Sequence, residues 1–216
     1  MNKWITEKEF IGKLKDGMSF FIGGFMACGT AERLIDFVLE SGVKDLTVIC
    51  NDAGYPGAGT ARLIEQNRVK KLIASHIGLN PEAGRRMSNG ELEVELVPQG
   101  TLAERIRAHG YGLGGVLTPT GVNTIVEANK KTITINEKKY LIEEPLGADI
   151  ALIKAHKSDK LGNLVFRKTE RNFNPVMATA AKNVFVWVDE VVEELDPEII
   201  VTPHVFSHYL LTGGAK

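Results

Sequence analysis

The sequence predicts an α/β fold, with an open, mostly parallel and partly mixed sheet that carries helices on both faces. Three observations support this fold. Short apolar segments alternate with helical patterns through the first half of the chain, which is typical of parallel strands joined by helices. An apolar strand at 18–22 runs into a glycine-rich loop at 23–29, and a helical pattern follows. A hairpin pattern at 132–142 indicates some antiparallel pairing in the second half.

Length and composition limit the classes of protein and partner. The 216 residues suffice for one good-sized core, so a single domain spanning 1–216 is expected. The formal net charge is −1 and no basic stripe occurs, so nucleic acid is not an expected partner. The apolar runs are too short to span a membrane, and the first residues lack the apolar core of a signal peptide. With two cysteines, expected to be reduced thiols, the chain is predicted to be cytoplasmic.

Each element of the first half has a local signal. Thr6 and Glu9 form a capping box that starts a helix running toward Leu14. Apolar residues at helical spacing from Leu34 to Leu39 predict a second helix, which Gly42 ends. Further strands are expected at 46–50, 71–74 and 92–96, and further helices at 61–65, 81–87 and 99–108.

The second half contains fewer helices. Apolar and polar residues alternate at 132–135 and 139–142 around Asn136, Glu137 and Lys138, which predicts a hairpin. Strands are expected at 149–154, 163–166 and 184–188, and one helix at 175–182. The hairpin suggests that the sheet is partly mixed.

Unusual residues follow three of the predicted strands. These are the loop at 23–29, the segment 51–54 and the segment 97–100. Ligands of open α/β sheets bind at the carboxyl ends of strands, so we expect a site here. Adjacent glycines let a ligand approach the main chain, and the following helix directs its free N–H groups at that ligand. The sequence therefore predicts binding of an anionic or carbonyl-bearing group.

Simpler interpretations of these strand ends remain open from the residues alone. The glycines could form a plain tight turn, Gln99 could cap the following helix, and Asn51 with Asp52 could be a turn. A dinucleotide site is disfavoured, because Met26 occupies the middle glycine of the Gly-x-Gly-x-x-Gly motif.

Three other features suggest chemistry only weakly. His204 and His208 have a spacing that suits zinc on a helix, but no third ligand lies nearby, so no metal is expected. Glu143 and Glu144 point to opposite faces of a strand and are expected at a solvated strand end. Cys28 has no adjacent base, so we expect a small packing residue rather than a nucleophile.

Five ordered stretches match one known sequence pattern. They are the segment 16–29 with Asp16-Gly17 and the glycine loop; Asn51-Asp52; the segment 91–107; Thr118-Pro119-Thr120-Gly121; and the segment 148–155 together with Gly162-Asn163-Leu164 and Arg171-Asn172-Phe173-Asn174-Pro175. Together they resemble the family I CoA-transferases, in chains of the alpha-subunit type. The resemblance spans nearly the whole chain and implies a CoA-transferase/sugar-isomerase-like fold.

The resemblance also implies a reaction. CoA moves between a short-chain acyl-CoA and a free carboxylate (acetoacetate, butyrate or acetate) in a ping-pong cycle through a glutamyl-CoA thioester. In the family the attacking glutamate lies in a Ser-Glu-Asn-Gly stretch of the beta chain, and no such stretch occurs here. The chain is thus expected to need a beta subunit, in an α2β2 assembly. CoA and acyl-CoA are expected as substrates, with no tightly bound cofactor.

Site residues carry over from the family by position. Gln99 resembles the oxyanion-hole amide, and Asn51 stands where the family keeps a polar residue near the reacting groups. The loop that resembles the CoA-contacting segment consists of Gly23, Gly24, Phe25, Met26, Ala27, Cys28 and Gly29.

The chain departs from the family pattern at four positions. Ala31 replaces a proline, His109 and Asn123 replace glycines, and His204 stands where glycine is common. These departures bear on loop stiffness and on the choice of carboxylate.

Two alternative functions are compatible with the same layout. A sugar-phosphate isomerase, or a related phosphate-binding domain, would hold a phosphate in the glycine loop and use a carboxylate of this chain as a base. A non-enzymatic scaffold would respond to neither ligand.

Overall fold

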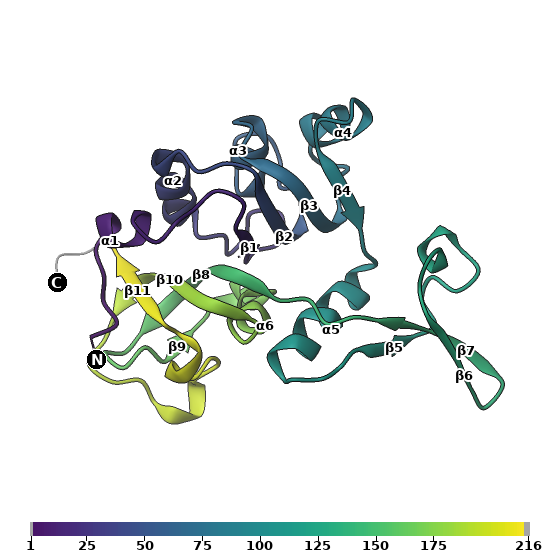
Figure 1. Ribbon diagram of the computed structural model, residues 1–216. Helices are drawn as coiled ribbons and strands as arrows, with labels where there is room; N and C mark the ends of the chain where they lie inside the picture. The colour runs from purple at the N-terminus through teal and green to yellow at the C-terminus, as the bar shows by residue number, and fades with distance from the viewer. Residues whose placement is uncertain (1, 214–216) are drawn as a thin grey trace.

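A parallel sheet forms the centre of the computed structural model, which describes residues 2–213 (Figure 1). Its strands run in the order β11-β10-β8-β1-β2-β3-β4, and each neighbouring pair is parallel. A short strand, β9, pairs antiparallel with β8 at one end. The strands are β1 (Ser19–Ile22), β2 (Leu46–Asp52), β3 (Val69–His76), β4 (Glu93–Leu96), β8 (Ala148–Ser158), β9 (Leu164–Val165), β10 (Ala181–Val191) and β11 (Tyr209–Thr212).

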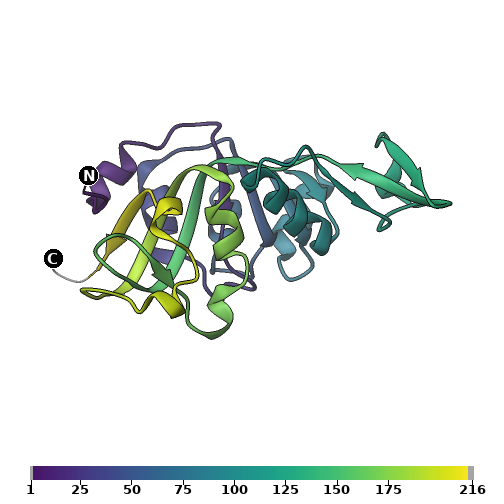
Figure 2. The same ribbon diagram turned by 90° about the horizontal axis from the view of Figure 1, so that it is seen from below.

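Helices cover both faces of this sheet, as the sequence predicts (Figures 1 and 2). One apolar core lies under α1 (Glu7–Ile11), α2 (Glu32–Ser41), α3 (Thr60–Glu65) and α4 (Pro81–Ser88). A second core lies on the opposite face, under α5 (Gln99–Gly110) and α6 (Asn174–Ala178). Single 3-10 turns occur at η1 (Ile125–Glu127), η2 (Lys168–Arg171), η3 (Pro197–Ile199) and η4 (His204–Phe206).

Local signals set the ends of the first helices. The capping box of Thr6 and Glu9 is present at the start of α1, although the helix ends at Ile11 rather than near Leu14. Gly42 ends α2 with a φ of 77°, a left-handed conformation that glycine adopts without strain.

The predicted hairpin lies outside the main sheet. Strands β6 (Thr132–Ile135) and β7 (Lys138–Glu143) join β5 (Val116–Thr118) in a separate antiparallel sheet, in the order β5-β7-β6. This sheet projects away from the body of the molecule (Figures 1 and 2). The main sheet is therefore mixed through β9, and the expectation that the hairpin makes it mixed is wrong.

Long-range pairing changes several predicted boundaries. Strands β8 and β10 pair from Ala148 to Ser158, well beyond their apolar segments. Charged residues at their ends sit opposite each other, and Lys157 forms an ion pair with Glu190 at 2.9 Å. Because β10 begins at Ala181, α6 ends at Ala178 and the predicted helix to 182 is too long. Strands β5 and β11 carry no pattern that predicts them.

Candidate functional site

The glycine loop after β1 folds into a tight turn. Phe25 and Cys28 exchange two backbone hydrogen bonds, of 3.0 and 2.9 Å, across Met26 and Ala27. These two central residues have φ values of 47° and 62°, which are uncommon for residues other than glycine. Such conformations store strain and persist only where the surroundings fix them.

The glycines of this loop are required by contacts with the rest of the chain. A Cβ atom on Gly23 would lie 2.0 Å from Oδ1 of Asn174, and one on Gly24 would lie 2.1 Å from Oγ1 of Thr30. Gly24 also has a φ of 130°, which disfavours any side chain. The space beside these two residues is therefore filled by protein, whereas the exposed side chains of Phe25 and Met26 form the open part of the loop.

Two asparagines outside the loop hold it in place. Asn172 Nδ2 donates to the carbonyl of Cys28 at 2.9 Å, and Asn174 Nδ2 donates to the carbonyl of Gly29 at 2.9 Å. Asn174 is fully buried, and its Oδ1 accepts from the backbone N–H of Lys154 at 3.1 Å. The sequence pattern contained both asparagines but gave them no role, because their partners lie far away along the chain.

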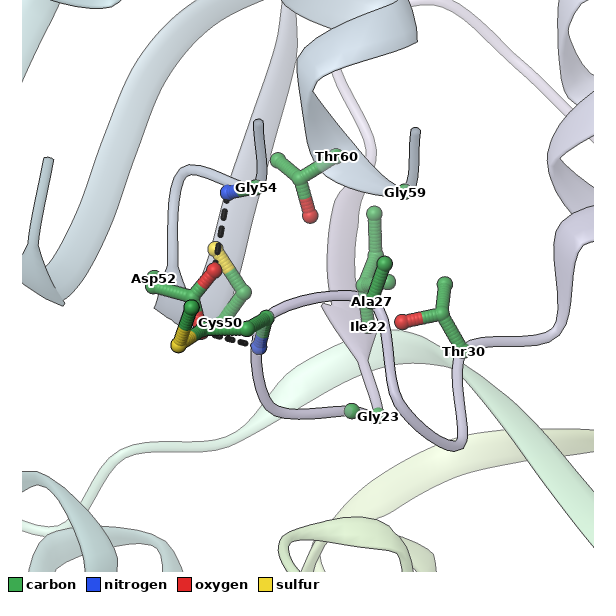
Figure 3. Close-up of a pocket in the computed structure, with 11 residues that line it drawn as sticks. Ile22, Gly23, Ala27, Thr30, Cys50, Asp52, Gly54, Gly59 and Thr60 are labelled. Atoms are coloured by element: carbon green, nitrogen blue, oxygen red, sulfur yellow. Dashed lines mark hydrogen bonds between the residues drawn. The ribbon is translucent and has the colours of Figure 1, made fainter. Parts of the chain in front are cut away.

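A chain of hydrogen bonds links the ends of β1, β2 and β4. Gln99 Nε2 donates to Asn51 Oδ1 at 2.6 Å, and Asn51 Nδ2 donates to Asp52 Oδ2 at 2.8 Å. The same carboxylate oxygen accepts from the backbone N–H of Met26 at 2.9 Å, and Asp52 Oδ1 accepts from Gly54 N at 2.9 Å. Figure 3 shows the carboxylate of Asp52 beside the backbone N–H of Gly54.

Two cavities adjoin this chain of bonds. The small one, about 10 Å³, has room for about one water and lies among Gly23, Gly24, Ala27, Thr30 and Asp52 (Figure 3). The larger one has a volume of about 280 Å³. It is lined by Phe25, Met26, Asn51, Asp52, Ser75, His76, Leu79 and Gln99. These residues come from the carboxyl ends of adjacent strands, where open α/β sheets bind ligands.

The larger cavity is lined mostly by neutral groups. Its described lining includes no lysine or arginine, and Asp52 is its only carboxylate. Asp52 is 7% exposed and already accepts three hydrogen bonds, so it is not free to act as a nucleophile. The exposed amide of Gln99 has a second N–H, which can donate a hydrogen bond to a ligand.

The structure brings together most of the predicted site residues. Phe25, Met26, Asn51 and Gln99 line the larger cavity, and Gly23, Gly24 and Ala27 line the smaller one. Cys28 and Gly29 line neither cavity. Sequence analysis placed Asp52 in a motif at a strand end but gave it no role at the site. It missed Ser75 and His76, for which the only signal is their place at the end of a strand.

The simpler interpretations of Gln99 and Asn51 are wrong. The side chain of Gln99 makes no capping bond at the start of α5, because it is used for Asn51. Asn51 and Asp52 lie within β2 rather than in a turn.

Two other expectations also need correction. Cys28 is exposed and lies 3.3 Å from Thr169 Oγ1, so it is not a packing residue. Glu143 is 3% exposed and pairs with Lys130 at 2.5 Å, so it is buried rather than solvated.

The two C-terminal histidines have separate partners. His204 Nδ1 lies 3.3 Å from Asn163 Oδ1, and Val184 N donates to His208 Nδ1 at 3.0 Å. Within 2–213, no group of three His, Cys, Asp or Glu side chains comes together in a way that could hold a metal ion. No helix in this range is long and apolar enough to cross a membrane.

Comparison with known sequences decides the family. A family model described as Coenzyme A transferase matches residues 6–212. The chain belongs to the coenzyme A transferase family. This confirms the resemblance carried by the five motifs, and it makes the chain part of a CoA-transferase class of enzyme.

Individual relatives cover the chain almost completely. It is 52% identical over 217 residues to "Acetate CoA-transferase subunit alpha" of Escherichia coli (strain K12), with 99% of each chain covered. It is 54% identical over 203 residues to "Acetoacetyl-CoA:acetate/butyrate CoA transferase alpha subunit" of Clostridium acetobutylicum, with 93% of each covered.

Solved structures of this family share the fold. The thioester complex with CoA of an acyl-CoA transferase from E. coli O157:H7 has a TM-score of 0.87 at 20% identity, over 97% of this chain and 46% of that chain. Glutaconate coenzyme A-transferase from Acidaminococcus fermentans has a TM-score of 0.85 at 19% identity, over 97% of this chain and 75% of that chain.

Two of the departures from the family pattern fit the local backbone of this CoA-transferase chain. Asn123 has a φ of 63°, which asparagine tolerates better than most residues, and Ala31 is the N-cap of α2.

Proposed function

We propose that this CoA-transferase chain is the alpha-type domain of an enzyme that moves CoA between a short-chain acyl-CoA and acetoacetate, butyrate or acetate. The reaction would run through a glutamyl-CoA thioester whose glutamate belongs to a beta subunit, in an α2β2 assembly. The names of the two relatives described above support these substrates and this partner. The cytoplasm is the compartment we propose, since both cysteines are free thiols.

One observation carries this proposal. The cavity at the strand ends combines a neutral amide donor, Gln99, with a single carboxylate, Asp52, whose oxygens are already hydrogen-bonded. A thioester can be polarised in such a site, but it cannot be attacked from within it. The attacking carboxylate would therefore have to come from another chain.

Gln99, the glycine loop and Asn51 would have different roles in this reaction. Attack on the thioester places negative charge on the carbonyl oxygen, and the free N–H of Gln99 would stabilise it, at about 3 kcal/mol for one such donor. The exposed side chains of Phe25 and Met26, with the turn that presents them, would contact the pantetheine arm of CoA. Asn51 is only 2% exposed, so it would act on the reacting groups mainly by holding Gln99.

The sugar-phosphate isomerase alternative is not favoured. A phosphate needs cationic or N–H-rich surroundings, and the described lining of the cavity includes no lysine or arginine. An isomerase also needs a free carboxylate base, and Asp52 is occupied by three donors.

Reconstitution tests the proposal. We expect negligible transfer between acetyl-CoA and acetoacetate with this chain alone or with its beta partner alone, and full activity after mixing. Robust turnover by the lone chain would contradict the shared site. A thermal shift with pentose phosphates but none with acyl-CoA would support the isomerase alternative instead.

A further inference from the structure

Asp52, the one carboxylate in the described lining of the larger cavity, contacts both the side chain of Asn51 and the glycine loop. Its Oδ2 accepts from the side chain of Asn51 at 2.8 Å and from the backbone of Met26 at 2.9 Å. Its Oδ1 accepts from Gly54 N at 2.9 Å, and the residue is 7% exposed. The mechanism proposed above gives this carboxylate no chemical step.

A carboxylate of this kind fixes the orientation of the amides beside it. An ionised carboxylate only accepts hydrogen bonds, so Asn51 must turn its Nδ2 toward Asp52. Asn51 Oδ1 then faces Gln99, and an acceptor in that position requires the donor end, Nε2, of the Gln99 amide. The other N–H of Gln99 is thereby left for the cavity, while its oxygen is kept away from Asn51.

We infer that Asp52 is a positioning residue that sets the amide of Gln99, through Asn51, with its N–H groups toward the reacting thioester. The same carboxylate holds the backbone N–H of Met26, in a turn whose two central residues have positive φ. Asp52 therefore joins the oxyanion donor to the loop that would contact CoA. This inference rests on the proposed function, because it needs Gln99 to act on the thioester.

A double-mutant cycle in the complete α/β enzyme tests the inference. Asp52→Asn removes the charge and lets both amides flip, so we expect kcat to fall about tenfold or more, with a separate rise in KM for acyl-CoA from the loosened turn. Gln99→Ala should lower kcat about a hundredfold. If Asp52 acts through Gln99, the double variant should be no more than about threefold slower than Gln99→Ala alone.

Two further variants keep the test decisive. Asn51→Ala cuts the link but leaves Asp52 on the turn, so we expect it to lower kcat about tenfold or more and leave KM for acyl-CoA nearly unchanged. Asp159→Asn is the matched control, because Asp159 is also buried and accepts from an asparagine side chain and three backbone N–H groups, away from the cavity. Asp159→Asn should lower the free energy of unfolding, and its effect on kcat should be the same in the natural enzyme and in the Gln99→Ala variant.

The outcomes separate the inference from the proposed function. The inference would be overturned if the loss of kcat in the double variant equalled the product of the losses in Asp52→Asn and Gln99→Ala. Full kcat in Asn51→Ala would also overturn it. Either result would leave the transferase mechanism in place. An unchanged kcat in Gln99→Ala would overturn the inference and remove this amide from the proposed mechanism, while the reconstitution experiment would still decide the CoA-transfer function.

Discussion

The side-chain amide of Gln99 donates to Asn51 Oδ1 at 2.6 Å, across 48 positions of sequence. Gln99 opens α5 just after β4, and Asn51 lies near the carboxyl end of β2. The bond therefore spans the edge of the sheet at which the strands end, and it passes beside the cavity that Phe25 and Met26 line. Because Asn51 is buried and Gln99 is exposed, the buried residue fixes the exposed one.

Replacement of Gln99 by alanine should reduce kcat by about a hundredfold or more in the complete enzyme, because one preorganised donor is lost. Gln99→Glu has nearly the same size but offers acceptors to Asn51 Oδ1, so it should lose at least as much. Steady-state kinetics measures both changes. Gln66→Ala, at the exposed C-cap of α3, is the control and should keep full activity. A Gln99→Ala enzyme with normal kcat would remove this amide from the mechanism.

Alanine at position 23 should destabilise the loop by about 1–3 kcal/mol, because its Cβ would overlap Asn174. That Cβ would lie 2.0 Å from Oδ1 of Asn174, whose side chain is held by Gly29 and Lys154. Urea unfolding measures the loss, and KM for acyl-CoA should rise in parallel.

A matched change isolates the steric effect. Gly84 lies inside α4, and apart from its chain neighbours and the nearby backbone of the helix, no described atom lies within 4 Å of the point that a Cβ atom would occupy there. Gly84→Ala should therefore be neutral or stabilise the chain by about 0.5–1 kcal/mol. Equal stability of Gly23→Ala and the natural chain would show that Asn174 does not restrict the loop.

Thiol labelling should report on the loop directly. Cys28 is exposed at the end of the turn, whereas Cys50 is buried, and its burial raises the pKa of the Cys50 thiol to about 12. One thiol per chain should therefore react quickly with a disulfide reagent, and Cys28→Ser should abolish that phase. Acyl-CoA should slow the reaction if the loop contacts CoA. Equal labelling rates with and without acyl-CoA would place Cys28 outside the bound ligand's reach.

Acid should weaken the hydrogen bonds between Ser19 of β1 and Asp149 of β8. Lys182, followed by the N–H and hydroxyl of Ser19, lowers the pKa of Asp149 from 3.8 to about 2. A carboxyl whose pKa is lowered on folding makes its full contribution to stability when the pH is above its ordinary pKa. This contribution is then lost as the pH falls from about 3.8 through about 2.

Two variants check this pH dependence. Asp149→Asn should be less stable than the natural chain at neutral pH, and the difference in unfolding free energy should shrink between pH 4 and about 2. Lys182→Gln should raise the pKa of Asp149 in an NMR titration, since Lys182 is the largest cause of the shift. A constant difference in stability across this pH range would rule out the carboxylate as its source.

Sequence reasoning found the elements whose signals are local. The capping box at Thr6, the glycine end of α2 and the hairpin at Asn136 are all present, because each depends on residues close together in sequence. It failed for β11 and for the full lengths of β8 and β10, because hydrogen bonds to neighbouring strands extend these elements.

The sequence by itself determined the class of fold, the family and the identity of the residues at the strand ends, since apolar spacing and motif order are properties of the chain. Tertiary structure alone decided that Asp52 faces both Asn51 and Met26, that Asn174 fills the space beside Gly23, and that Glu143 is buried. The physical reason is that a hydrogen bond or a steric contact depends on distances of a few ångströms between segments far apart in sequence. Parallel strand order brings those segments together at one edge of the sheet.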